Sequence, residues 1–112
     1  MKLQHCTLCP KACGADRTRT AGWCGGGAEM RAARAALHFW EEPCISGKGG
    51  AGAVFFSGCA LRCCFCQNRQ ISQEWFGKAI SVSQLSEILL RLQEQGAETL
   101  DLVTGSHYAP WI

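Results

Sequence analysis

With 112 residues, the chain has the length of one small domain, and a hydrophobic fraction of 47% is enough for a core. The net charge of +2 is too small to indicate a nucleic acid or an anionic membrane as partner. No apolar stretch resembles a secretory signal peptide, and no run is long enough to span a bilayer. We therefore expect a protein of the reducing cytoplasm.

Nine cysteines are a high count for this length, and the compartment decides how they are interpreted. In a secreted chain they would suggest a disulfide framework. The odd count, the tight clustering and the absence of a signal peptide favour ligation of a metal or a cluster, with disulfides as the alternative.

Residues 1–27 are rich in cysteine and glycine and have neither a helical nor a strand period. The segment is too polar to fold around a core, so it needs a cross-link or a bound metal. Four of its side chains supply the thiols: Cys6, Cys9, Cys13 and Cys24. We expect them to hold a second iron–sulfur cluster or a zinc ion, since four thiolates suit both. A cysteine knot without metal is the alternative.

The alanine-rich residues 28–40 predict a short helix, which Pro43 would end. The glycine-rich stretch 47–52 follows as a flexible turn. It resembles a phosphate-binding loop only superficially, because no strand precedes it and the Gly-Lys-Ser/Thr ending is absent.

Residues 53–112 predict an α/β portion. The stretches "AVFFS" (53–57) and "TLDLVT" (99–104) are typical of buried strands. The helix between them begins with a capping box of Ser81 and Gln84 and ends at Gly96. Its apolar face comprises Val82, Leu85, Ile88, Leu89 and Leu92. Strand, helix and strand form a βαβ unit with parallel strands.

The densest cysteine cluster follows the first of these strands, in "FFSGCALRCCFCQN". Three thiolates from one short loop, Cys59, Cys63 and Cys66, could bind three corners of a cubane cluster and leave the fourth iron open. An open position is typical of a catalytic rather than a structural metal. The alternatives are a redox pair of Cys63 and Cys66, or zinc. We expect Cys64 to pack beneath the loop.

This motif, with an aromatic residue before its last cysteine and an apolar strand ahead of it, resembles the radical S-adenosylmethionine (SAM) motif. "GCALRCCFCQN" is further similar to relatives of the pyruvate formate-lyase activating enzyme. One branch of these also carries "CxLCPxxCG…GxCG" and "EEPCISG", and both occur here, at 6–25 and 41–47. Cys44, in the latter, is either a further ligand or a core residue.

The resemblance implies a 4Fe-4S cluster held by Cys59, Cys63 and Cys66, with SAM chelating the open iron. Reduction would cleave SAM to a 5′-deoxyadenosyl radical, which abstracts hydrogen from a substrate. It also implies an electron donor such as flavodoxin or ferredoxin. The substrate would be a small molecule or a partner protein that becomes a glycyl-radical enzyme. No catalytic side chain is identified.

The resemblance also implies two SAM-contacting regions. Phe65 would lie at the adenine. Gly105, Ser106 and His107 follow the second strand, where related proteins hold the SAM amino group with Gly-Gly-Glu. Ligands of α/β folds bind beyond the carboxyl ends of strands. The alternative for His107 is a surface histidine in a loop.

The expected fold is the start of a radical SAM β/α (partial TIM-like) barrel. Residues 1–46 would form the irregular Cys-rich segment with its short helix, and 47–112 the first βαβ portion. Because the sequence ends just after its second strand, we expect an incomplete barrel that is inactive alone. The alternative function is a non-catalytic iron–sulfur or zinc protein for electron transfer or structure.

Overall fold

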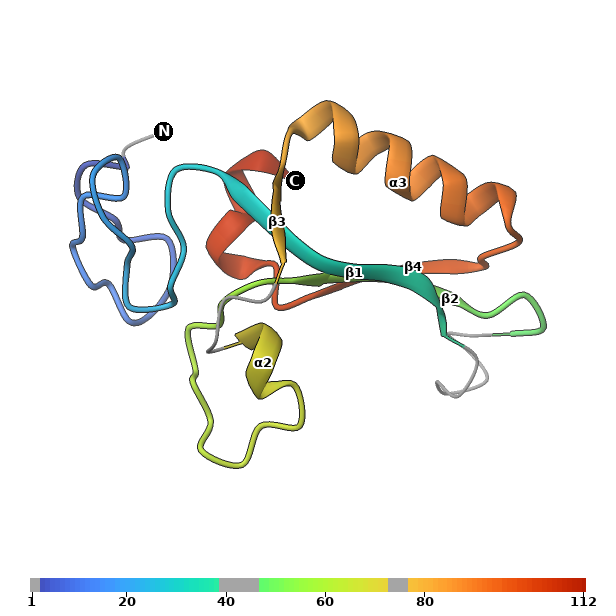
Figure 1. Cartoon of the computed structure of the whole chain (residues 1–112), viewed down its shortest axis with the longest axis horizontal. Helices are drawn as coiled ribbons and strands as arrows, with labels where there is room; N and C mark the ends of the chain where they lie inside the picture. Colours follow the sequence, from blue (N-terminus) through green and yellow to red (C-terminus); the bar gives the residue numbers. More distant parts are fainter. Residues whose placement is uncertain (1–2, 39–46, 73–76) are drawn as a thin grey trace.

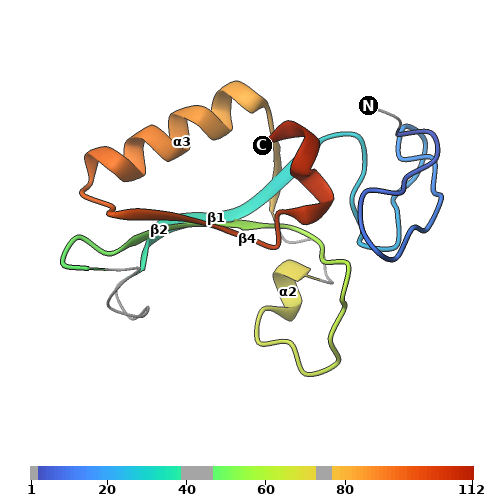
Figure 2. The same cartoon turned by 180° about the vertical axis from the view of Figure 1, so that it is seen from behind.

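The computed structural model describes residues 3–38, 47–72 and 77–112. Four strands form one sheet in the order β3-β1-β2-β4. The strands are β1 (Met30–His38), β2 (Ala51–Phe56), β3 (Lys78–Ile80) and β4 (Thr99–Val103). The helices are α2 (Arg69–Ser72), α3 (Val82–Glu94) and the 3-10 helix η1 (Ser106–Trp111). Helix α3 covers one face of the sheet, and α2 lies on the other side with its loop (Figures 1 and 2).

The helix predicted at residues 28–40 is wrong, because the described part of this stretch forms strand β1. This strand pairs antiparallel with β2 on one side, where Ala36 lies opposite Ala53, and with β3 on the other, where Met30 lies opposite Ile80. Alanine has the highest helix propensity, but propensity contributes only a few tenths of a kcal/mol per residue, so the hydrogen bonds along both edges of the strand override it. Pro43 and Cys44 lie outside the described residues.

The predicted βαβ unit is confirmed. Strands β2 and β4 pair in parallel, with Val54 opposite Leu102, and α3 lies between them in the sequence. The capping box is present: the Ser81 hydroxyl accepts from the Gln84 amide at 3.1 Å, and the Gln84 side chain accepts from the Ser81 amide at 2.8 Å. Gly96 ends the helix with a φ of +102°, a conformation that favours glycine.

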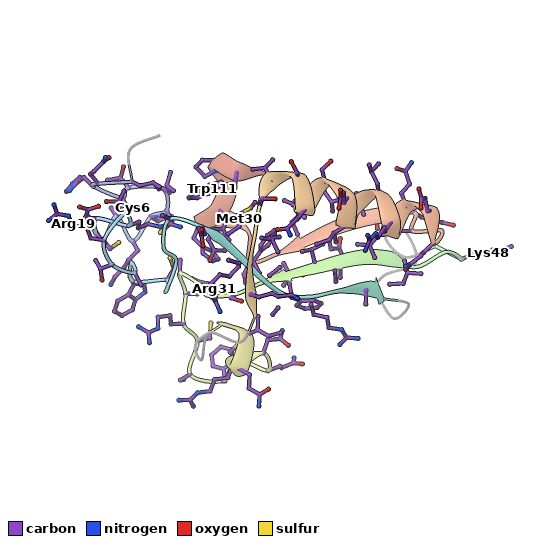
Figure 3. All side chains as sticks on the ribbon, turned by 45° about the horizontal axis from the view of Figure 1, so that its top comes forward. Cys6, Arg19, Met30, Arg31, Lys48 and Trp111 are labelled. Carbon is purple, nitrogen blue, oxygen red and sulfur yellow. The ribbon has the colours of Figure 1, made fainter. Side chains whose placement is uncertain are left out.

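The core lies between α3, the sheet and η1. Its fully buried members are Met30, Val54, Phe56, Leu85, Leu92 and Tyr108. Trp111 packs against this cluster from η1, close to Met30 (Figure 3). On the predicted apolar face of α3, Ile88 and Leu89 are half-buried, whereas Val82 is exposed. The core therefore fixes the carboxyl ends of β2 and β4, from which the cysteine loop and η1 depart.

The sheet joins the two predicted portions of the chain, since β1 comes from the first and β2 from the second. Residues 3–29 lack helices and strands and coil beside one end of the sheet (Figure 1). That this sheet is the start of a radical SAM β/α (partial TIM-like) barrel stays a prediction. In the described part of the chain, no helix is long and apolar enough to cross a membrane.

Candidate functional site

The carboxyl ends of β2 and β4 meet at one edge of the sheet, because the two strands run parallel. The Thr104 hydroxyl donates to the Phe56 carbonyl at 3.2 Å, and His107 Nε2 bonds the Ser57 carbonyl at 2.8 Å. The structure thus brings His107 to the start of the cysteine loop. Gly105 caps η1, and Ser106 is exposed.

His107 is buried, with only 1% of its surface exposed, so the alternative of a surface histidine is wrong. Because a carbonyl only accepts, Nε2 carries the proton in this bond. Burial lowers the pKa of His107 below its usual 6.5, and the Arg17 charge adds to the lowering, although the Ser57 bond opposes it. A neutral imidazole results, whose Nδ1 is buried and has no hydrogen-bond partner among the described residues.

The cysteine loop begins at Gly58, where the chain passes close to the N-terminal segment. Gly58 has a φ of +87°, and a Cβ there would stand 2.5 Å from the Cys24 carbonyl oxygen. The next amide, of Cys59, donates to that same oxygen at 3.0 Å. The Gly58 amide donates to the carbonyl of Ile71 in α2, also at 3.0 Å. The loop is therefore tied at its base both to α2 and to the Cys-rich segment.

The three predicted ligands, Cys59, Cys63 and Cys66, are each half-buried. Cys64 is exposed, so the prediction that it packs beneath the loop is wrong. Among the described residues, no three His, Cys, Asp or Glu side chains lie close enough to share one metal ion. A cubane does not require this, because each thiolate binds its own iron at a separate corner. Three accessible thiols on one loop fit that donor set.

Two large apolar side chains of the loop, Leu61 and Phe65, are 80% and 84% exposed. Exposed apolar side chains mark a binding surface where they form a contiguous patch. The predicted adenine contact of Phe65 stays a prediction, and its exposure leaves the ring free for a ligand.

Trp23 attaches the Cys-rich segment to the same loop. Its indole N–H donates to the Ala60 carbonyl at 2.9 Å. The cations of Lys11 and Arg62 lie 4.1 and 5.0 Å from the centre of its rings. Such contacts each contribute about 0.5–1 kcal/mol at exposed sites. Trp23 thus connects the Cys-rich segment to the loop that carries the candidate ligands.

Arg17 is the residue that sequence reasoning missed. Scattered arginines predict a solvated surface, yet Arg17 is 1% exposed. Its guanidinium donates to the carbonyls of Gly27 and His107, at 3.0 and 2.8 Å, and lies near the Tyr108 and Trp111 rings. No local pattern in the sequence marks it, because its partners are far away along the chain.

Comparison with known proteins identifies the loop's domain. A family model described as "4Fe-4S single cluster domain" matches residues 45–109. An uncharacterized protein of Methanocaldococcus jannaschii is 34% identical over 78 residues, which are 70% of this chain and 22% of that protein. The chain thus spans about a fifth of the length of this relative. No solved structure matches this chain significantly.

Proposed function

The chain belongs to the 4Fe-4S single cluster domain family, and on this basis we propose that it is a radical SAM protein whose Cys59, Cys63 and Cys66 bind the cluster. The observation that carries the proposal is the position of these thiols. They lie within the matched domain, on one loop that leaves the carboxyl end of a parallel strand. Three ligands leave one iron of a cubane without a protein thiolate, which is where SAM would bind.

When bound and reduced, the cluster would supply the electron that cleaves the sulfonium C–S bond of SAM and so generates a 5′-deoxyadenosyl radical. The protein's task is to position SAM and to exclude water. The exposed Phe65 ring offers an apolar surface for the adenine. His107 stays neutral beside the base of the loop, with Nε2 held by Ser57, and so adds no positive charge there.

The partner is proposed from the resemblance to pyruvate formate-lyase activating enzymes. It would be a glycyl-radical-type protein or a small molecule, with flavodoxin or ferredoxin as the electron donor. Turnover is proposed to need the further βα units of a complete barrel, because the matched relative is several times longer than this chain.

Electron transfer without SAM chemistry is the second candidate. It is favoured by the exposure of Leu61 and Phe65, which would let a redox partner approach the loop closely.

The two candidates are separated by electron paramagnetic resonance of the anaerobically reconstituted and reduced chain, recorded with and without SAM. Radical SAM function predicts that SAM changes the cluster signal, because it binds directly to one iron, and that Cys64→Ser behaves like the unmodified chain. A cluster signal that is indifferent to SAM would reject the proposal in favour of electron transfer. Failure to form any cluster would reject both.

A further inference from the structure

We propose that the N-terminal segment binds a second metal, a single ion of the zinc class, through Cys6, Cys9, Cys13 and Cys24. The matched family domain begins at residue 45 and is described as holding a single cluster, so it accounts for none of these four thiols.

The segment has no apolar core that could order it. Within residues 3–29 the buried residues are only Cys6, Arg17, Cys24 and Gly26. The large apolar side chains of Leu8 and Trp23 are exposed. A stretch of this kind gains too little from burial to offset the entropy of ordering, and small folds commonly use a metal instead. Two of the four buried positions are cysteines.

Backbone hydrogen bonds bring the cysteines into one small coil. The Cys6 amide donates to the Ala15 carbonyl at 3.0 Å, and the Gly14 amide donates to the Cys6 carbonyl at 2.9 Å. These bonds place Cys6 beside Gly14 and Ala15, the two residues that follow Cys13. The Cys13 sulfur in turn lies 3.4 Å from the position of a Cβ on Gly22, in the turn that carries Cys24.

Cys24 completes the group. Its sulfur and Arg17 Nη2 lie 3.1 and 2.8 Å from the position of a Cβ on Gly26, and Arg17 Nη1 faces the Cys6 sulfur at 3.8 Å, so that Arg17 lies beside both cysteines. Figure 3 shows Cys6 within the coil, whereas Arg19 projects from its outer edge.

Two cysteines have the same local geometry. Cys13 and Cys24 are each followed by a glycine in the left-handed region, Gly14 at a φ of +68° and Gly25 at +87°. At the second, the amide of Gly26 turns back and donates to the Cys24 sulfur at 3.2 Å. This hydrogen bond fixes the orientation of the Cys24 side chain within the turn.

The strongest argument is the buried charge of Arg17. A buried guanidinium is costly unless an anion compensates it. Among the described residues, no carboxylate lies within ion-pair distance of Arg17; the one ion pair found joins Arg19 to Asp16. Its Nη1 instead faces the Cys6 sulfur at 3.8 Å, and its Nη2 is buried without a hydrogen-bond partner among the described residues. A divalent ion held by four thiolates is a net anion, and it would supply the missing charge.

The four thiols are too far apart in this structure to bind one ion together, since no three metal-binding side chains in the described ranges could share an ion. Cys6 and Cys24 are buried, whereas Cys9 is half-buried and Cys13 is exposed. We therefore infer that binding draws the two outer thiols inward, and that metal binding and ordering of the segment occur together.

The test uses the full chain with Cys59, Cys63 and Cys66 all changed to Ser, so that a failure of the cluster proposal cannot affect it. Zinc per chain is counted after purification, and anaerobic Co²⁺ titration follows the absorption of a thiolate-bound tetrahedral ion. We expect one ion per chain in this background and its loss when Cys13→Ser is added. Because Cys13 is exposed, its change is not expected to unfold the chain, and Cys64→Ser is the matched control.

Arg17→Gln should weaken Co²⁺ binding by about 10-fold, as loss of an outer-sphere partner commonly does. The proposal is overturned if the triple variant binds no Co²⁺, if Cys13→Ser binds it as well as the Cys64→Ser control does, or if iron and sulfide rather than one ion are found on these cysteines.

Discussion

Replacing Trp23 by Phe tests whether the Cys-rich segment holds the cysteine loop in place. The change keeps an aromatic ring between Lys11 and Arg62 but removes the indole N–H that donates to the Ala60 carbonyl at 2.9 Å. A net hydrogen bond contributes about 0.5–1.5 kcal/mol. Since Trp23 is 43% exposed, we take the lower part of that range, about 0.5–1 kcal/mol. This corresponds to a roughly 2- to 5-fold larger population of the detached loop.

The assay is hydrogen–deuterium exchange of the cysteine-loop amides, residues 59–66, read by mass spectrometry. We expect exchange to be roughly 2- to 5-fold faster in Trp23→Phe, and faster still in Trp23→Ala, which also loses both cation–ring contacts. Leu8→Ala, an exposed position on the same segment, should leave the loop unchanged. Unchanged loop exchange in Trp23→Ala would refute the idea that the segment holds the loop.

Three further changes test the fold and the base of the loop. Ser81→Ala removes the helix cap and should lower the free energy of unfolding, measured by urea titration, by about 1 kcal/mol. Ser83→Ala, in the first turn of the same helix, should change it by less than about 0.5 kcal/mol. Equal effects of the two changes would contradict the capping box. Gly58→Ala should lower the free energy of unfolding by about 1–2 kcal/mol because of its φ of +87° alone, and by more because of the clash with the Cys24 carbonyl. Gly27→Ala should be tolerated, because a Cβ there meets nothing within 4 Å. Similar melting temperatures for the two variants would argue against the close approach of Gly58 to Cys24. Because the pKa of His107 is lowered in the folded protein, the unfolded chain takes up the proton first as the pH falls. The contribution of the neutral histidine to stability is therefore present above pH 6.5 and is lost as pH falls below it. In His107→Gln the free energy of unfolding in urea should depend less on pH over this range, and an unchanged pH profile would contradict a buried neutral histidine.

The fold was predictable where its signals are local. Helix α3 carries its own start and stop, in Ser81, Gln84 and Gly96, and the apolar strands on either side make a βαβ unit the simplest solution. Strand β1 was not predictable, because its alanines favour a helix in isolation. Only the distant partners β2 and β3, on its two edges, make it a strand.

The same division applies to the site. Candidate cluster ligands on one loop are recognisable from their spacing, and the iron–sulfur family is confirmed by the domain match. The bonds of Arg17 to His107 and of Trp23 to Ala60 were not predictable, because they join positions 90 and 37 residues apart in the sequence. Burial of Arg17 depends on how the Cys-rich segment packs against η1, and the composition of the segment does not determine this packing.

The central claim is that Cys59, Cys63 and Cys66 hold the cluster, and the most direct measurement is the iron and acid-labile sulfide content of single serine variants reconstituted anaerobically. The account predicts that each of these three variants loses most of the about four irons and four sulfides of a cubane, and that Cys64→Ser, on the same loop and exposed, retains them. Iron and sulfide contents that are unchanged in the three variants, or that fall equally in Cys64→Ser, would contradict it.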